Sequence, residues 1–304
     1  MIRRLAALSS LALLLAAPAA LAAPPGFAFL EVPTGARASG MGGAYLAVAD
    51  GIEAAWWNPA ALAGIQGTQL TASHFEYFEN LRHEQFAIGS RHFGGGLAAS
   101  VRAMYSEPIE ERDEIGNLIG TFGSHDLELQ LAYGHRSAGG IGFGLGAQMI
   151  RERIASETAM TWGGSIGMDV RPARVPDLRA SLAVQHAGPS AHYDIDGQQG
   201  RPVNLPLAVH GGVAWHRGLG NGLGLTPALD VRATRGRQAV VALGAELDSD
   251  TGAALRLGLR QGDDIASGSA GLGWRWRAYR VDYAWVPSKL DLGDTHRFSF
   301  AAQF

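Results

Sequence analysis

The feature that most constrains this chain is an alternation of apolar and polar residues that begins at Gln69 and continues to the C-terminus. Residues 127–131 read Leu-Glu-Leu-Gln-Leu, and residues 255–259 read Leu-Arg-Leu-Gly-Leu. A period of two places one kind of side chain on each face of an extended strand. The pattern therefore predicts an all-β fold in which every strand has one apolar and one polar face.

Fourteen segments follow the pattern, and most are near the ~10 residues that a tilted strand needs to cross a bilayer. An exported soluble sandwich would also alternate, but it would seldom need fourteen strands of this length. The sequence thus favours a transmembrane antiparallel β-barrel formed by residues 69–304. The predicted strands are 69–78, 84–93, 96–107, 122–136, 140–154, 159–171, 178–187, 206–217, 222–233, 238–247, 253–261, 268–277, 279–286 and 295–304.

The connections between these strands provide a separate test of the barrel. If the first strand runs outward, the two longest connections, 108–121 and 188–205, both fall on the outer side. The short glycine-containing connections 94–95, 137–139 and 218–221 all fall on the inner side. Long outer loops and short periplasmic turns are typical of bacterial outer-membrane barrels.

The N-terminus has the features of a secretory signal peptide. Arg3 and Arg4 precede a short apolar run, and Ala20-Leu21-Ala22 is a small-x-small cleavage site, so residues 1–22 are expected to be removed. An exported chain with no cysteine cannot use disulfides or thiol chemistry. The 25 basic and 28 acidic residues form no basic patch, which argues against a nucleic-acid partner.

The last predicted strand ends in alternating aromatic residues. Phe298, Phe300 and Phe304 share one face, and this arrangement resembles the C-terminal assembly signal of outer-membrane barrels. The sequence therefore places the protein in the outer membrane of a Gram-negative-type bacterium, in contact with outer-membrane lipid. Further aromatic residues on the apolar faces suit the girdles at the two membrane interfaces, namely Trp215, Trp274, Trp276, Tyr283 and Trp285.

The polar faces of the predicted strands carry charges of both signs. Such charges inside a barrel must be paired or hydrated, because an unpaired buried charge is unfavourable. A fourteen-stranded barrel is also too wide to be filled by its own side chains. We therefore expect a wet, partly plugged lumen lined by Arg232, Glu246, Arg256, Arg260, Arg275 and Asp282, with Arg102, Glu128, Asp230 and Arg297 on the same face.

Residues 23–68 are the only segment after the signal peptide long enough to be the plug. They are rich in glycine and alanine and show no clean alternation. Glycines allow close approach of backbones, and Asn58-Pro59 marks a local break with a short helix beginning near Pro59. The residues expected to form the plug or gate are Gly40, Gly42, Gly43, Asp50, Trp56, Trp57, Asn58, Pro59 and Ala60.

Three short motifs in this segment carry a family resemblance. Residues 40–45 (GMGGAY), 47–50 (AVAD) and 58–60 (NPA) resemble, in this order, the N-terminal hatch of the FadL long-chain fatty-acid transporter family. They resemble even more closely the smaller PorV/PorQ-type outer-membrane proteins. The resemblance implies a fourteen-stranded barrel with an N-terminal plug that passes hydrophobic compounds. Some PorV-type members instead serve a secretion or surface-attachment apparatus.

One departure limits what the resemblance implies. FadL transporters have long outer loops with an apolar docking groove, whereas the outer loops here are shorter and polar. From the resemblance we therefore expect this chain to have the plug, but we do not assign it the ligand site of the FadL transporters. Two hypotheses follow: passive uptake of small hydrophobic compounds, or an accessory protein of a secretion or envelope-assembly system with secretion-system proteins as partners.

Enzymatic and metal-dependent functions are disfavoured. His135 and Ser137 share a strand face, as a base and nucleophile would, but they lie at an inner turn and no third orienting residue is evident. The acidic segment 107–114 lacks the glycine-centred pattern of a calcium loop. We therefore expect no catalytic residues, no metal and no cofactor.

Overall fold

The computed structural model describes residues 24–195, 197–290 and 292–304. The predicted signal peptide, residues 1–22, lies outside this range, as does the first residue of the predicted plug. Within the described residues, no helix is both long and apolar enough to cross a membrane.

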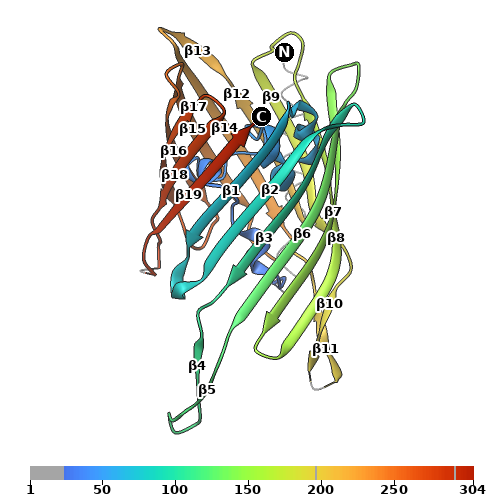
Figure 1. Ribbon diagram of the computed structural model, residues 1–304, viewed down its shortest axis with the longest axis vertical. Coiled ribbons are helices and arrows are strands. Elements are labelled where there is room, and N and C mark those ends of the chain that lie inside the picture. Colours follow the sequence, from blue (N-terminus) through green and yellow to red (C-terminus); the bar gives the residue numbers. More distant parts are fainter. Residues whose placement is uncertain (1–23, 196, 291) are drawn as a thin grey trace.

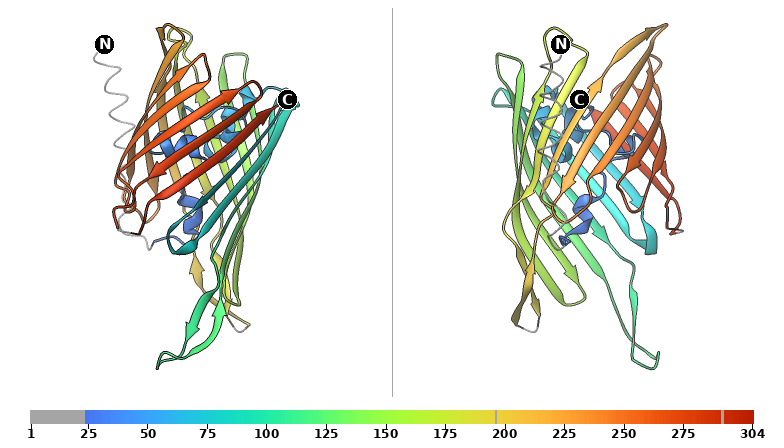
Figure 2. Two further views of the ribbon diagram at one scale, coloured as in Figure 1. Left: turned by 60° about the vertical axis from the view of Figure 1, so that its left-hand side comes forward. Right: turned by 180° about the vertical axis from the view of Figure 1, so that it is seen from behind.

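The molecule is a closed antiparallel β-barrel (Figures 1 and 2). Its main sheet has 17 strand segments, and it closes because the first strand pairs with both the second and the last. Three of these segments, β10 (Ala191–Ile195), β11 (Gln198–Val203) and β13 (Arg217–Gly220), are short extensions, which leaves a wall of fourteen strands. The wall strands are β1 (Thr68–Glu76), β2 (Arg82–His92), β3 (Gly95–Tyr105), β6 (Ser124–Arg136), β7 (Ile141–Ile154), β8 (Glu157–Val170), β9 (Leu178–Ala187), β12 (Ala208–Trp215), β14 (Leu223–Thr234), β15 (Val240–Ser249), β16 (Ala253–Gln261), β17 (Gly268–Trp276), β18 (Tyr279–Val286) and β19 (Thr295–Gln303).

The alternation in the sequence becomes the two faces of this wall. Leu255, Leu257 and Leu259 of β16 are 55%, 68% and 64% exposed on the outside, whereas Arg256 between them is 3% exposed and points inward. Charged residues are thus inside and aliphatic residues outside, the reverse of a water-soluble barrel. This arrangement is that of a barrel surrounded by lipid, and it confirms the predicted fold class.

The strand prediction differs from the structure mainly outside the wall. The predicted outer connections 108–121 and 188–205 contain two extra hairpins, β4 (Ile109–Arg112) with β5 (Leu118–Phe122), and β10 with β11. All four residues of β4 are exposed, so no burial alternates along it. A hairpin that is wet on both faces leaves no period-two signal, and for this reason the sequence did not reveal it.

The two ends of the barrel are different. The β4–β5 and β10–β11 hairpins project from one end, which we call the hairpin rim (Figure 1). The opposite end, the turn rim, carries the short turns and the C-terminal Phe304. The predicted grouping of long connections at one end and short turns at the other is therefore confirmed.

The N-terminal segment lies inside the barrel as a series of short helices (Figure 2). They are η2 (Ala28–Glu31), α2 (Ala36–Gly40), η3 (Gly51–Glu53), α3 (Ala54–Trp57) and η4 (Pro59–Gly64). We call residues 24–67 the plug. Its apolar side chains form the core with small inward-facing residues of the wall, which leave room for it, namely Ala87, Ala98, Ala132, Ala214, Ala228 and Ala242.

Candidate functional site

The plug runs along the lumen between the two ends. Near its start, the Gly26 N–H donates to the Asn204 carbonyl (3.1 Å), beside the β10–β11 hairpin. At its end, Thr68 and Phe304 exchange two backbone hydrogen bonds of 3.0 and 2.8 Å at the turn rim. The candidate functional site is therefore the whole lumen, with the plug as the structure that closes it.

Wall glycines hold the last helix of the plug by direct backbone contact. A Cβ atom added at Gly144 would lie 2.2 Å from the Ala60 nitrogen, and one at Gly167 would lie 2.0 Å from Oδ1 of Asn58. Asn58 is fully buried, accepts from the Ala60 N–H (3.1 Å) and donates to the Met168 carbonyl (3.0 Å). The predicted Asn58-Pro59-Ala60 motif is thus the N-terminal cap of η4 and its attachment to β8.

The predicted glycine motif makes a second backbone contact on the other side of the lumen. A Cβ at Gly258 of β16 would lie 2.0 Å from the Gly42 nitrogen, and Gly42 itself has a φ of 65° that favours glycine. The Arg260 Nε donates to the Gly42 carbonyl (2.9 Å). Gly43 (φ 81°) lies against the same guanidinium, so this part of the plug is also held to the wall.

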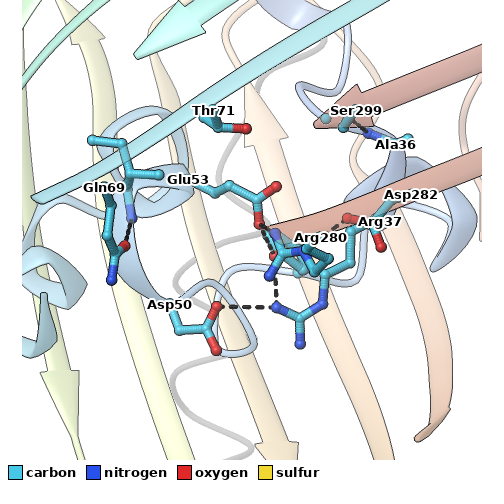
Figure 3. Close-up of polar contacts among 12 residues, drawn as sticks. Ala36, Arg37, Asp50, Glu53, Gln69, Thr71, Arg280, Asp282 and Ser299 are labelled. Atoms are coloured by element: carbon cyan, nitrogen blue, oxygen red, sulfur yellow. Dashed lines mark hydrogen bonds and ion pairs between the residues drawn. The ribbon is translucent and has the colours of Figure 1, made fainter. Parts of the chain in front are cut away.

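Ion pairs connect the plug to the wall in one continuous chain. Figure 3 shows its two plug-side ends, with Arg37 beside Asp50 and Glu53 near Arg280. From the plug, Arg37 pairs with Glu246 of β15 (2.7 Å) and with Asp50 (3.0 Å). Glu246 also pairs with Arg256 (2.5 Å), and Arg256 pairs in turn with Asp282 of β18 (2.8 Å).

The chain of ion pairs returns to the plug through Arg280. This guanidinium contacts Asp282 (2.8 Å) and Glu53 of the plug (2.7 Å), and the Tyr45 hydroxyl donates to Glu53 (2.6 Å). Three arginines thus face three buried carboxylates. Asp50, which ends the chain of ion pairs, has a side chain that is 58% exposed. The expected condition that mixed charges in the lumen be paired is met here.

A second polar contact lies deeper in the lumen, around Asp230 of β14. Its carboxylate accepts from the backbone N–H groups of Tyr45 (2.8 Å) and Leu46 (2.7 Å), and it lies 3.2 Å from Nε2 of His210. The Trp57 ring packs between Tyr45 and His210, with centroid distances of 5.5 and 5.9 Å. These contacts fix the middle of the plug across the lumen.

Cavities lie on both sides of the plug. Toward the hairpin rim, a cavity of about 220 Å³ is bounded by Val32, Gly42, Trp57, His210 and Arg232 among others. Toward the turn rim, two cavities of about 420 and 550 Å³ share Asp50, Arg275 and Arg280. Gly42 and Gly43 line the hairpin-side cavity and Ala47 and Val48 line a turn-side cavity, so this stretch of the plug lies between them.

The six residues predicted to line the lumen all face inward. Glu246, Arg256 and Asp282 are at most 6% exposed and take part in the ion-pair chain, and Arg260 binds Gly42 and Asp263. Arg232 lines the hairpin-side cavity. Arg275 lines the turn-side cavities, and its side chain has no ion pair within the described residues.

The predicted aromatic residues separate into two groups. Trp57 is buried in the plug core, and Gln185 donates to the carbonyls of both Trp56 and Trp57. Phe298, Phe300 and Phe304 instead face the outside, where they are 51%, 41% and 68% exposed.

The sequence interpretation missed Arg37, Glu53 and Arg280, which complete the ion-pair chain. Two signals were available. Arg37 is the only Lys or Arg between residues 24 and 67, and Arg280 shares the strand face of Asp282, two positions further on. A lone cation in an apolar plug and a cation beside an inward carboxylate both require a partner.

The pair considered for catalysis lies apart from the lumen. His135 is exposed on the outer surface, and Ser137 begins the turn between β6 and β7. Within the described part of the chain, no group of three or more His, Asp or Glu side chains could hold a metal ion.

Together, the wall and the plug define a fourteen-stranded β-barrel of the FadL-like outer-membrane type. Three solved structures share this fold at 12% sequence identity, with at least 89% of this chain and 98% of the other covered. They are the Ralstonia pickettii toluene transporter TbuX (TM-score 0.59), the CymD monoaromatic hydrocarbon channel (0.60) and a Pseudomonas aeruginosa FadL homologue (0.52). Identity this low shows the fold alone.

Sequence comparison adds one match. Residues 22–144 match the model of an uncharacterised protein family, UPF0164. This range contains the whole plug and the first strands of the wall, less than half of the chain. No curated protein matches the sequence significantly.

Proposed function

We propose that this protein is a passive outer-membrane channel for small hydrophobic compounds. The observation that carries the proposal is the hairpin-side cavity of about 220 Å³, whose lining includes Trp57 of the plug. Val32, Pro33, Ala242 and Val286 provide further apolar lining, and charged residues such as Arg232, Arg260 and Asp263 line the rest of the cavity. The cavity is below the ~300–1,000 Å³ typical of drug-sized ligands, so its volume suits a compound of about one ring.

The similar structures support this substrate class. TbuX is described as a toluene transporter and CymD as a monoaromatic hydrocarbon channel, and both have the same barrel. In our proposal the hairpin rim faces the outside of a Gram-negative-type cell and the turn rim faces the periplasm. Outer-membrane lipid then covers the exposed leucines of the wall.

Passage requires the plug to rearrange, because residues 41–48 lie between the cavities. A compound held against Trp57 would reach the turn-side cavities once the bonds from Asp230 to Tyr45 and Leu46 open. These are charge-assisted hydrogen bonds in a confined space, so opening is expected to be infrequent. The flow is down the concentration gradient of the compound.

The test is uptake of a labelled monoaromatic hydrocarbon by cells that lack the gene. Uptake should fall in the deletion strain and recover with the wild-type gene. The Trp57→Ala variant, which changes the cavity lining, should alter the uptake rate, whereas Trp276→Ala on the outer surface should not. Unchanged uptake in the deletion strain would refute the transport function.

The plug motif provides a second test. Replacing Asn58 and Pro59 together with alanine removes the cap of η4 and its bond to Met168. We expect altered permeability with normal membrane assembly, because the wall strands supply the assembly contacts. If the variant fails to assemble, residues 58–59 are a folding element rather than part of a gate.

A second candidate function is a PorV/PorQ-like accessory protein that transports nothing. The specific observation in its favour is how firmly the plug is attached, through the Arg37–Glu246 pair and the Gly144 and Gly258 contacts. In this case uptake would be unchanged in the deletion strain, and components of a secretion or envelope-assembly complex would co-purify with the protein.

A further inference from the structure

Two tryptophan–arginine pairs face outward at the turn rim. The Arg217 guanidinium lies 5.4 Å from the centroid of the Trp215 ring, and that of Arg277 lies 4.9 Å from the Trp276 ring. The two indoles are 41% and 57% exposed on the outer surface. Each pair therefore holds a cation at the edge of the surface that lipid covers.

One of the pairs continues into a larger aromatic surface. Tyr279 stacks on Trp276 (6.4 Å between centroids) and on Phe300 (5.9 Å), and it meets Phe304 edge-on (6.5 Å). Across the β18–β19 pair, Tyr279 is opposite Ala302, which is buried, while the rings of Tyr279, Phe300 and Phe304 remain 40%, 41% and 68% exposed. We call Trp276, Arg277, Tyr279, Phe300 and Phe304 the aromatic platform.

The cation of the platform is free to bind an anion. Within the described residues, neither Arg277 nor Arg217 forms an ion pair with a carboxylate. The acidic residues toward this rim are Asp177 between β8 and β9, Asp248 at the end of β15, Asp250 between β15 and β16, and Asp50 of the plug, which lines the same turn-side cavity as Arg277. Arg277 also has a φ of 54°, a conformation that side-chain-bearing residues rarely adopt, in the tight turn that places it over Trp276.

The hairpin rim has the opposite charge. There the Trp285 Nε1–H donates to Asp294 (2.8 Å), so this indole is paired with an acid. The β4–β5 hairpin at the same rim is also acidic, with Glu107, Glu110, Glu111, Asp113 and Glu114. Aromatic residues thus accompany cations at one rim and a carboxylate at the other.

We propose that the aromatic platform is a binding site for an anionic phospholipid of the leaflet at the turn rim. The headgroup phosphate contacts the Arg277 guanidinium, whose planar donors match phosphate oxygens. The acyl chain lies along Tyr279 and Phe300, which continue from the rim into the apolar band. The Arg217–Trp215 pair also presents a cation beside an indole, but it lacks the adjoining rings and therefore binds the phospholipid more weakly.

Lipid retention by the purified protein tests this site. Full-length mature protein in detergent micelles is mixed with equal amounts of dioleoyl-phosphatidylglycerol and dioleoyl-phosphatidylcholine, and the retained lipids are counted by native mass spectrometry. The wild type should retain phosphatidylglycerol preferentially. Arg277→Gln should lower its affinity about fivefold, the effect of one basic residue at an anionic lipid surface.

Matched variants separate this site from general lipid contact. Arg201→Gln removes an exposed arginine of the β10–β11 hairpin, and Trp162→Leu removes an indole that is 61% exposed elsewhere on the wall. Neither should change the preference, whereas Trp276→Leu should reduce it. Arg277→Lys keeps the positive charge and should therefore retain part of the preference for phosphatidylglycerol. Such partial retention would show that the lost preference in Arg277→Gln is not caused by misfolding.

Two results would overturn the proposal. The first is equal retention of both lipids by the wild-type protein. The second is an equal loss of phosphatidylglycerol in Arg277→Gln and Arg201→Gln, which would indicate non-specific attraction. The measurement involves no transport, so its outcome is independent of the proposed channel function.

Discussion

At the scale of single residues, the lumen shows how charges are kept inside a membrane barrel. Glu246 illustrates this, because its two oxygens are shared between Arg37 of the plug and Arg256 of the wall. It is 5% exposed, so solvent compensates poorly for a lost partner. Replacing one charged residue of this ion-pair chain by an uncharged one is therefore expected to lower the stability of the protein strongly.

The first prediction concerns this carboxylate. Glu246→Gln leaves Arg37 and Arg256 facing an amide, and breaking a buried pair destabilises by about 3–5 kcal/mol. Urea unfolding of the reconstituted protein measures the change. Glu110→Gln is the matched control, because its pair with Arg112 is more than half exposed and should contribute less than ~1 kcal/mol. Equal effects of the two substitutions would contradict the importance of the buried chain.

The second prediction concerns the glycine contacts. Gly144→Ala places a methyl group 2.2 Å from the Ala60 nitrogen, and overpacking of this kind costs about 1–3 kcal/mol. Gly218→Ala, where nothing lies within 4 Å, should change stability by less than ~0.5 kcal/mol. Thermal unfolding in detergent distinguishes them. A neutral Gly144→Ala would mean that η4 can move away from the wall freely.

The third prediction is a pH dependence at Asp263, in the loop that follows β16. Burial alone would raise the pKa of this carboxyl, but the Arg260 guanidinium and the N–H groups of Ala266 and Ile265 hold the pKa below its ordinary value. Its stabilising contribution is therefore complete above the unfolded pKa of about 3.9, and it is lost as the pH falls through the folded pKa.

Melting curves of the wild type and Asp263→Asn check this sign. The wild type should be more stable at pH 7, the difference should stay constant down to about pH 5, and it should shrink below about pH 4. A difference that grows on acidification would contradict the assigned direction.

The sequence predicted which charged residues face inward but not which of them pair. Strand parity alone placed Glu246, Arg256 and Asp282 on the inner face. Arg37, the plug partner of Glu246, lies 209 positions away from it in the sequence, and Glu53, the plug partner of Arg280, is similarly distant from its own partner. Local signals mark Arg37 and Arg280 as cations that need a partner, but no local pattern records which carboxylate each one contacts, so the pairing itself could not be predicted.

At the scale of elements, the wall strands and the plug helices differ in how well they can be predicted. A strand of nine or more alternating residues repeats its signal several times. The plug helices have only three to six residues, at most two turns each, so no helical periodicity can develop. Asn58-Pro59 at the start of η4 is the exception, because capping chemistry is local.

The fourth prediction concerns the β4–β5 hairpin. It forms a separate two-stranded sheet, and below it the Ser106 N–H already donates to the Ser124 carbonyl (3.0 Å). Replacing residues 108–121 with a short glycine-containing turn should therefore leave the barrel assembled. Heat-modifiable migration in detergent gels measures assembly. A shortened protein that no longer shows the folded band would mean that the hairpin guides the β3–β6 pairing.

At the scale of the whole molecule, the barrel exists because its first and last strands meet. β1 and β19 pair over seven residue positions, from Gln69 opposite Gln303 to Phe75 opposite Arg297. Phe304 extends this seam through its two backbone hydrogen bonds with Thr68. The seam leaves no open sheet edge, as a membrane barrel requires.

The fifth prediction tests this seam. Deleting Phe304 removes both hydrogen bonds and its contact with Tyr279, so the fraction of heat-modifiable protein in the membrane should fall. Phe93→Ala is the control, because Phe93 is 87% exposed in a turn at the same rim and takes no part in closure. Normal assembly without Phe304 would contradict its predicted role as an assembly signal.

The position of the plug also sets the order of events during folding. Residue 67 leads directly into β1, which forms one side of the closing seam. The residues that pair across this seam are more than 220 positions apart in the sequence. Pairing over such a separation is slow compared with the formation of local hairpins. If the barrel closed first, the N-terminal segment would have to enter the lumen through one of its two ends. We therefore expect the open sheet to wrap around its own N-terminus, so that placement of the plug and closure of the wall occur together.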